Sequence, residues 1–482
     1  MRKYYIISIT IIFFSLPLLG FSQTIKAQSG SFGVDSTNNI IIWHIADFEQ
    51  LDTYQISGID FGELFKLDKP SKLNYTDVFS VTAQDKTYKL FITSLPVIHL
   101  KLNASVINNR KKSAGILTYY NDQYFIEACV GVRHRGNLSL TFAKKSYDLE
   151  FWKDSDTKET VDVQFRSMRS DDDWMLDAMY NEPLRLRSMV AIKLWLNIHK
   201  PYYFKKEPEA KNGFEAKYVE VFKNGEYQGL YQLCEPVDKK QLKLKSHHGD
   251  SINGQLYEAN SYKGGPSFIK ISEPYNNIFP HWNGWKTEYP LIDYRSDYQD
   301  LYNLQDLVIN GSNSEFKSKI SSLVDLDNVI DYYLFVNVIR ATDNLGKNYF
   351  LAKYDKDEPF FFVPWDLDGT FGVIQDGKRI VTTDDVLTNG LFKRLIALNP
   401  NNYTSKLKRR WDYLRKGEFS NSVIWPHIEV IYEKFTKENV YMREHMVWQN
   451  KLTQISNEKH FEYIKDWFER RMIYLDSYIK SL

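Results

Sequence analysis

One succession of segments constrains this chain more than any other part of its sequence. Leu326–Ile339 has the apolar content of a buried helix, and it leads into a loop that carries Asp343 and, five residues later, Asn348. Two apolar runs then predict a pair of short strands joined by a turn: Tyr349–Lys353 and Phe360–Val363. Asp366 follows the second strand. We expect Asn348 and Asp366 to lie at the ends of this strand pair, close enough to share one ion.

This order of helix, loop, strand, turn, strand and acidic residue is that of a protein-kinase catalytic core, where a loop Asp receives the hydroxyl proton and an Asn and a second Asp hold Mg²⁺. Mg²⁺ prefers oxygen ligands and takes only a few of them from protein, because phosphates and waters supply the rest. An ordinary helix-to-strand loop with capping Asp and Asn residues also explains the pattern. No His-Arg pair precedes Asp343, and Asp366 is followed by Leu367 rather than by Phe.

Two basic stretches in the N-terminal half fit the same chemistry. The segment 142–145 reads as part of a strand, in which period 2 places Ala143 and Lys145 on one face, as in the kinase strand that meets adenine and phosphates. Before it, a turn carries Arg133 and Arg135 where kinases have a glycine-rich loop, and paired guanidinium donors suit phosphate. Surface strands often carry Lys and Arg, so these residues alone do not decide between the two interpretations.

A hairpin is predicted farther along the chain, over Tyr218–Phe222 and Tyr227–Glu235. The reason is Asn224-Gly225 between the two strands, a pair that tolerates the positive φ of a type I′ turn. Glu235 ends an apolar row of the second strand, and such a carboxylate is costly to bury unless it is paired. It lies either at the wet end of the strand or facing a site.

Together these segments resemble the CotH family, the spore-coat-protein-H-type atypical kinases. The matching segments follow the family's order: Gly131–Asn137, Lys144–Tyr147, Leu186–Ser188, Asn224–Glu235, Asp343–Asn348 and Trp365–Gly372. The helical tail resembles the family's C-terminal part through Trp411–Leu414 and Trp467–Leu475. The resemblance runs from about residue 95.

The resemblance implies an α+β, remote protein-kinase-like two-lobed fold. Residues 23–94 lie outside the resemblance, and their strand-like runs and turn residues predict a β-rich N-terminal accessory region. It implies a kinase domain at 95–482, with an N-lobe over about 95–240, a C-lobe over about 241–482 and a helical C-terminal part. The implied activity is ATP-dependent, Mg²⁺-dependent phosphoryl transfer to a protein hydroxyl, with protein substrates as partners.

The resemblance also assigns roles to single residues. Asp343 would be the catalytic Asp, and Asn348 and Asp366 would bind Mg²⁺. Asp368 would be a second ligand or a support. The nucleotide-binding residues would be Lys145, with Lys144 as the alternative, together with Arg133, Arg135 and Glu235.

The N-terminus has the pattern of a secretory signal peptide at 1–22. A basic start precedes an almost unbroken apolar stretch from Tyr4 to Phe21, and Gly20 and Ser22 are the small residues of a cleavage site. An uncleaved membrane anchor is the alternative, since a stretch of this length just spans a bilayer. With cleavage we expect no integral membrane span and an exported protein, in the periplasm, at the cell surface or outside the cell.

Charge and cysteine content exclude other classes. Lys and Arg total 62 against 61 Asp and Glu, and this near neutrality argues against a nucleic-acid partner. The two cysteines, Cys129 and Cys234, exclude a disulfide scaffold and are either paired or free. Beside a kinase, two functions stay open: a catalytically inactive structural or surface-assembly protein on a kinase-like scaffold, and a carbohydrate-processing or carbohydrate-binding protein, suggested by 11 Trp and 33 Tyr.

Overall fold

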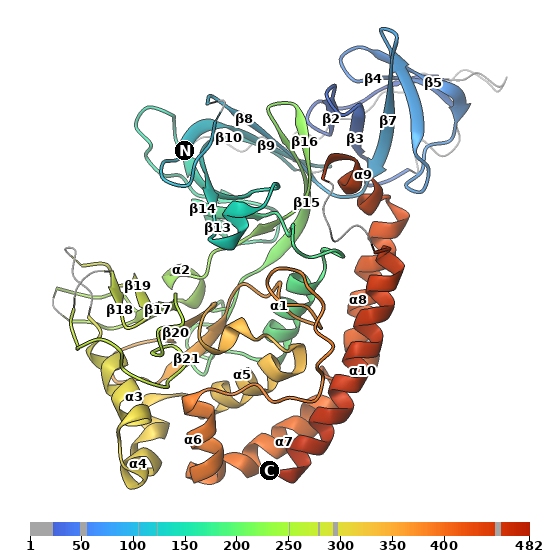
Figure 1. Ribbon diagram of the computed structural model, residues 1–482. Helices are drawn as coiled ribbons and strands as arrows, with labels where there is room; N and C mark the ends of the chain where they lie inside the picture. The colour runs from blue at the N-terminus through green and yellow to red at the C-terminus, as the bar shows by residue number, and fades with distance from the viewer. Residues whose placement is uncertain are drawn as a thin grey trace. The chain divides into compact units, whose positions relative to one another are not determined.

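The computed structural model describes residues 23–48, 55–104, 106–122, 124–249, 251–277, 280–292, 297–448 and 455–482. It is an α+β structure with a β-rich N-terminal region and a helical C-terminal region, which confirms this part of the predicted fold class (Figure 1). The chain forms two compact units. Unit 1 contains residues up to 180, 216–235 and 432–453, and unit 2 contains 181–215, 236–431 and 454–482. The predicted signal peptide at 1–22 lies outside the described residues.

The first part of unit 1 is a seven-stranded sheet in the order β1-β4-β5-β6-β7-β3-β2. Its strands are β1 (Gln23–Lys26), β2 (Phe32–Asp35), β3 (Ile40–His44), β4 (Ile56–Asp60), β5 (Leu64–Ser71), β6 (Phe79–Ala83) and β7 (Lys86–Thr93). Strand β3 is buried along its whole length because it serves two cores. Ile41 and Trp43 pack into the core of this sheet, whereas Ile40 and Ile42 pack with Phe222.

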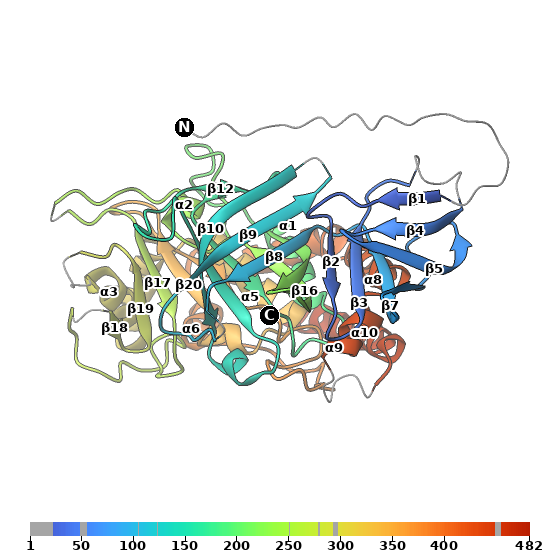
Figure 2. The ribbon, with the colours of Figure 1, turned by 90° about the horizontal axis from the view of Figure 1, so that it is seen from above.

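The second part of unit 1 is a closed barrel in the order β10-β11-β14-β16-β15-β8-β9, whose strands β8, β9 and β10 run side by side in Figure 2. The strands are β8 (Val97–Leu102), β9 (Ser113–Asn121), β10 (Tyr124–Arg135), β11 (Ser146–Trp152), β14 (Asp173–Asp177), β15 (Ala216–Lys223) and β16 (Glu226–Cys234). Between β15 and β16, Asn224 and Gly225 have φ values of 51° and 85°. The predicted two-residue hairpin turn is therefore confirmed.

Smaller elements complete unit 1. A short hairpin joins β12 (Val163–Gln164) to β13 (Ser170–Asp171), and the helix α9 (Val440–Val447) packs against β16. The helix α8 (Asn421–Lys437) leads toward α9 along the chain. The thiols of Cys129 and Cys234 are not bonded to each other.

Unit 2 is built on a five-stranded sheet in the order β18-β19-β17-β20-β21. Its strands are β17 (Gln255–Ala259), β18 (His281–Trp282), β19 (Trp285–Tyr289), β20 (Tyr349–Lys353) and β21 (Phe360–Pro364). The last two are antiparallel, as predicted, and Tyr349 faces Pro364 at one end of the pair. This register fixes where the residues that flank the two strands emerge.

The helices of unit 2 are α1 (Arg187–Ile198), α2 (Lys239–Leu242), α3 (Gln299–Ile309), α4 (Asn313–Leu323), α5 (Leu326–Ile339), α6 (Gly390–Leu398), α7 (Tyr403–Lys416) and α10 (Asn457–Ser481). Every residue of α5 except Asp327 is buried, because β21, α1, α7 and α10 all pack against this helix. A helix covered on all sides has to be apolar all round, which explains the sequence of Leu326–Ile339.

The structure corrects one predicted strand. The segment 142–145, expected to be part of a strand, instead forms a bend between the short 3-10 helix η1 (Leu138–Thr141) and β11, which starts at Ser146. The alternation argued for Ala143 and Lys145 therefore does not apply, because the backbone is not extended there.

The residues Asn181-Glu182-Pro183 have the pattern of a helix start, but α1 starts only at Arg187 and Asn181 does not cap it. The Glu182 carboxylate accepts hydrogen bonds from the backbone N–H groups of Leu184 (2.9 Å) and Arg187 (3.1 Å), so it satisfies donors that a helix start leaves open.

Among the described residues, no helix has both the length and the apolar character required to cross a membrane.

Candidate active site

Asp343 starts the 3-10 turn η2 (Asp343–Leu345) just after α5. The helix ends at Arg340, whose left-handed backbone is held by a two-pronged pair with Asp385, at 3.0 Å from Nε to Oδ1 and 2.7 Å from Nη2 to Oδ2. The Asp343 side chain is half-buried. Burial and the Asp343 carboxylate both raise the pKa of Tyr262.

The hairpin register brings Asn348 and Asp366 to one end of the strand pair, as predicted. Asn348 precedes β20, Trp365 follows β21, and the Trp365 N–H donates to the Asn348 carbonyl at 3.1 Å. Asp366 comes next and is exposed. Asn348 and Asp366 both have positive φ, 57° and 53°, a conformation that Asn and Asp tolerate better than most residues. Both residues therefore leave the extended path of their strands at the same end of the sheet.

Asn344 joins the Asp343 loop to this end of the hairpin. Its buried side-chain amide donates to the carbonyls of Asn348 (2.6 Å) and Trp365 (2.8 Å). The backbone carbonyl of Asn344 accepts a hydrogen bond from the Tyr332 hydroxyl at 2.8 Å. One amide therefore holds together the loop that carries Asp343 and the two chain segments that carry Asn348 and Asp366.

Asp368 is half-buried and accepts a hydrogen bond from the side-chain amide of Asn181, which also donates to the Gln375 carbonyl at 2.6 Å. The segment before α1 thus orients Asp368.

The donor set at the hairpin end fits Mg²⁺. Asn348, Asp366 and Asp368 offer an amide oxygen and carboxylate oxygens, which are the ligands of this hard cation, and they are few enough to leave room for phosphate oxygens and waters. Among the described residues, one group of three carboxylates lies close enough together to hold a metal ion by itself. It consists of Asp162, Asp171 and Asp172 in unit 1. The roles of the hairpin-end residues in metal binding stay predictions.

In unit 1, the two adjacent lysines have different partners. The Lys144 ammonium group is fully buried, pairs with the Glu444 carboxylate on α9 at 2.8 Å and donates to the Leu230 carbonyl at 2.5 Å. A Cβ atom at Gly229 would collide with this carboxylate, so a glycine with φ of 91° makes the room for it. The Lys145 ammonium group instead donates to the carbonyls of Leu140 and Phe142 beside η1.

The two arginines near the end of β10 face different residues of β11. Arg133 faces Asp148 across the β10–β11 ladder, and its Nε donates to that carboxylate at 2.5 Å. Arg135 faces Ser146 at the end of the same ladder. Arg133 already has an anionic partner within unit 1, whereas the proposed contact of either guanidinium with phosphate stays a prediction.

Glu235 lies just after β16 and is fully buried, so the interpretation as the wet end of the strand is wrong. Its carboxylate accepts a hydrogen bond from the backbone N–H of Arg169 at 2.9 Å. A contact with nucleotide stays a prediction.

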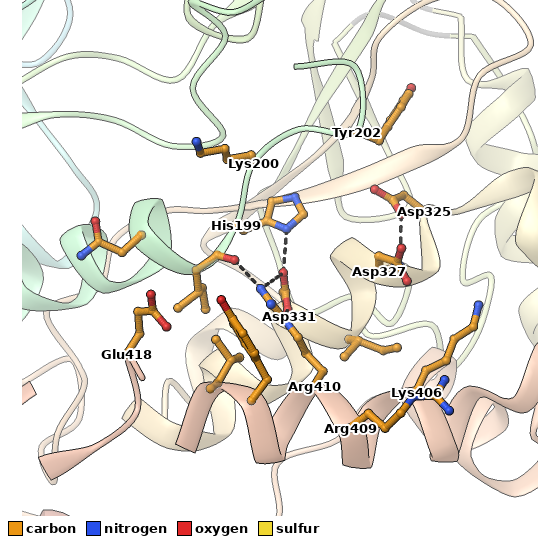
Figure 3. Close-up of a pocket in the computed structure, with 15 residues that line it drawn as sticks. His199, Lys200, Tyr202, Asp325, Asp327, Asp331, Lys406, Arg409, Arg410 and Glu418 are labelled. Carbon is orange, nitrogen blue, oxygen red and sulfur yellow. Dashed lines mark hydrogen bonds and ion pairs between the residues drawn. The ribbon is translucent and has the colours of Figure 1, made fainter. Parts of the chain in front are cut away.

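A cavity of about 650 Å³ opens elsewhere in unit 2, at the end of α1, the start of α5 and along α7 (Figure 3). On its wall, Asp331 accepts from His199 Nδ1 at 2.9 Å and from Arg410 Nε at 2.6 Å. Further charges of both signs line it: Lys200, Lys406, Arg409, Asp325, Asp327 and Glu418.

None of the predicted site residues lines this cavity. It adjoins the start of α5, whereas Asp343 follows its end, and a helix of 14 residues spans about 21 Å. The cavity and the Asp343 loop are therefore separate features of unit 2.

Three residues of these sites were missed by the sequence analysis: Asn181, Asn344 and Glu444. Asn344 lies inside the loop already singled out, so its buried amide had a local signal. The others reach the site residues only through folding, because Lys144 and Glu444 are 300 positions apart.

Comparison with known proteins agrees with the motif positions. The family model described as "CotH kinase protein" matches residues 132–475, which include every predicted site residue. The curated relative "Inner spore coat protein H" of Bacillus subtilis (strain 168) is 22% identical over 310 residues, which cover 63% of this chain and 76% of the relative.

Proposed function

Because the chain belongs to the CotH family, we propose that it is an exported, Mg²⁺-dependent protein kinase, which transfers the γ-phosphoryl group of ATP to a hydroxyl group of a protein. The proposal includes a remote protein-kinase-like fold with two lobes. The observation that carries it is the joining, by Asn344, of the Asp343 loop to the hairpin end that carries Asn348 and Asp366.

Each residue of this set has a distinct part in the proposed reaction. Asp343 orients the acceptor hydroxyl and accepts its proton as the oxygen attacks phosphorus, a contribution of about 10²–10⁴-fold in rate. Asn348 and Asp366 would hold Mg²⁺, and Asp368, oriented by Asn181, would support them. The bound ion would neutralise part of the charge on the phosphates.

We infer that Lys144, rather than Lys145, is the lysine that serves the phosphates. In protein kinases this lysine forms an ion pair with a glutamate of a helix. Lys144 forms such a pair with Glu444 of α9, whereas the ammonium group of Lys145 donates hydrogen bonds to carbonyls of residues nearby in the sequence.

A second candidate function is a surface-assembly protein that no longer catalyses. The relative's name as an inner spore coat protein supports it, since that name describes a structural location rather than a reaction. The retained Asp343, Asn348 and Asp366 favour the kinase, because an assembly role does not require them.

Phosphate transfer and nucleotide affinity, measured side by side, separate these functions. Purified mature protein is incubated with γ-labelled ATP and dephosphorylated casein, with and without Mg²⁺, and ATP binding is followed by calorimetry. Asp343→Asn should bind Mg-ATP nearly normally and transfer about 10²–10⁴-fold more slowly, because its loss is confined to the transition state. Asp366→Ala should lose the Mg²⁺ dependence of ATP binding.

The hairpin supplies a matched control at its other end. Asp357 lies in the exposed turn between β20 and β21 with φ of 63°, so Asp357→Asn changes the same charge in a backbone that tolerates Asn. It should leave transfer and binding unchanged. Absence of any transfer by the wild-type protein, with ATP neither bound nor consumed, would favour the assembly protein.

A further inference from the structure

The inner wall of the cavity in unit 2 is a hydrogen-bonded network whose charges are already paired. The Asp331 carboxylate accepts from Arg410 through both Nε (2.6 Å) and Nη2 (3.1 Å), and from His199 Nδ1 (2.9 Å). Arg410 Nη2 also donates to the Ile198 carbonyl at 2.5 Å, and the Asn328 amide lies 3.1 Å from His199 Nε2. These groups hold α1, α5 and α7 together, and their charges are satisfied within the protein.

Along α7 the cavity is lined by a basic stripe with a different property. Lys406 and Arg409 are three positions apart and Tyr413 follows four positions later, so the three side chains share one face of the helix. The Tyr413 side chain is 65% exposed, and the Arg410 guanidinium lies 5.4 Å from the centre of its ring. Within the described part of the chain, neither Lys406 nor Arg409 forms an ion pair.

The start of α5 places two carboxylates on the same cavity. Asp325 precedes the helix and accepts from the Asp327 N–H at 3.1 Å, and Asp327 lies in the first turn. Figure 3 shows both carboxylates above the α7 side that carries Lys406 and Arg409. No ion pair joins either carboxylate to a cation of the described residues. Unlike charges therefore line one cavity without pairing, and each remains available to a charged ligand.

A ligand that satisfies both sides carries charges of both signs. An extended peptide does so when acidic and basic residues alternate, because successive side chains point to opposite sides of the backbone. The stripe from Lys406 to Tyr413 spans about 10 Å, which matches about three extended residues and exceeds a single amino acid. The cavity volume of about 650 Å³ lies within the range of ligand sites.

We propose that this cavity binds a segment of the protein substrate in which acidic and basic residues alternate. The acidic side chains contact Lys406 and Arg409, and the basic side chains contact Asp325 and Asp327. The docking role rests on the proposed kinase function. Because α5 spans about 21 Å between the cavity and the Asp343 loop, about six extended residues separate the docked segment from the acceptor hydroxyl.

Binding of a labelled peptide to the full mature chain, without ATP, tests the site directly. The probe is a short fluorescein-labelled peptide of alternating Glu and Lys, and its anisotropy at low ionic strength reports saturation. The double variant Lys406→Ala, Arg409→Ala should weaken binding about tenfold, the combined effect of two exposed ion pairs. Peptides of alternating Glu and Ser, or Lys and Ser, should bind about tenfold more weakly, because each meets only one side of the cavity.

The double variant Lys317→Ala, Lys393→Ala is the matched control. Both lysines are exposed in unit 2, form no ion pair with a described residue and do not line the cavity. Their removal changes the net charge of the protein by the same amount and should leave binding of the Glu-Lys peptide unchanged.

Phosphate transfer to two synthetic peptides tests the docking role. Both contain the same hydroxyl-bearing sequence, and one also carries the Glu-Lys stretch about six residues away. The stretch should lower KM about tenfold without changing kcat, because it adds binding that is equal in the ground and transition states. The double variant Lys406→Ala, Arg409→Ala should remove this gain and keep kcat.

The outcomes separate this inference from the proposed function. Absence of saturable binding, equal binding of the Glu-Ser peptide, or binding that survives Lys406→Ala, Arg409→Ala would overturn the site and leave the kinase standing. An unchanged KM for the longer acceptor peptide would overturn the docking role. Binding of the Glu-Lys peptide with no phosphate transfer to any acceptor would overturn the proposed function and the docking role with it.

Discussion

Lys144 and Lys145 differ by one position, and the local backbone decides which of them is buried. In an extended strand their side chains would alternate between two faces. The chain instead bends between η1 and β11. As a result, the Lys144 side chain is buried and pairs with Glu444, whereas the Lys145 ammonium group donates to the Leu140 carbonyl of η1. The directions of the two lysine side chains therefore depend on the bend at 142–145, which the sequence pattern did not predict.

Removal of the Lys144 charge should destabilise unit 1 strongly. Lys144→Met leaves the Glu444 carboxylate buried without its cation, and breaking a buried pair in this way costs about 3–5 kcal/mol in the free energy of unfolding. Lys145→Met removes hydrogen bonds from a half-buried ammonium group and should cost about 1 kcal/mol. Urea denaturation of the full chain, followed through unit 1 by hydrogen exchange, measures both.

The double variant Lys144→Met, Glu444→Gln supplies the control. It should be less destabilised than Lys144→Met alone, because no unpaired buried charge remains. A larger effect of Lys145→Met than of Lys144→Met would show that the assignment of the two lysines is reversed.

At the scale of elements, α5 packs against β21, and the loop that follows α5 is joined to the end of the β20–β21 pair by the side chain of Asn344. The pattern of apolar residues predicts both elements, because a fully covered helix and a buried hairpin have continuous apolar sequences. It does not predict how the elements are joined. That junction is the amide of Asn344, whose two donors reach the backbone on both sides of the hairpin end.

Loss of this amide should loosen the hairpin end without unfolding unit 2. Asn344→Ala removes two buried hydrogen bonds, and at about 1 kcal/mol each the expected cost is about 2 kcal/mol. Hydrogen exchange of the Trp365 amide, which donates to the Asn348 carbonyl, should become faster by one to two orders of magnitude, about tenfold for each 1.4 kcal/mol. Asn303→Ala is the control, since Asn303 lies exposed on α3 and should leave this exchange unchanged.

At the scale of the whole molecule, each of the two units is built from segments that are not contiguous in the sequence. The predicted division into lobes at 95–240 and 241–482 is contiguous, whereas unit 1 also contains residues 432–453 and unit 2 begins at residue 181. Buried pairs hold the late segment in unit 1: Arg443 pairs with Glu220, and Glu438 accepts from the Ser94 hydroxyl at 2.6 Å. Contacts between residues 200 or more positions apart leave no local sequence pattern.

Export should determine the mature N-terminus. Because the first 22 residues have the pattern of a cleaved signal, the protein recovered from a secreting host should begin near Gln23 by N-terminal sequencing. Ile12→Arg interrupts the apolar stretch and should leave Met1 in place, while Thr24→Ala, just past the expected cleavage site, should still be processed. Met1 retained in secreted wild-type protein would contradict cleavage.

The sequence by itself predicted the buried helix α5, the β20–β21 pair and the hairpin turn between β15 and β16. These features are local properties of the sequence, so they can be recognised without the fold: the period of apolar residues, the Asn224-Gly225 turn, and the spacing of Asp343, Asn348 and Asp366. Tertiary structure alone decided which side chains meet. Lys144 pairs with Glu444 and Asp368 with Asn181, because burial makes partners of groups that lie far apart in the sequence. The cost of burying an unpaired polar group selects such pairings, and it acts only once the whole chain has folded.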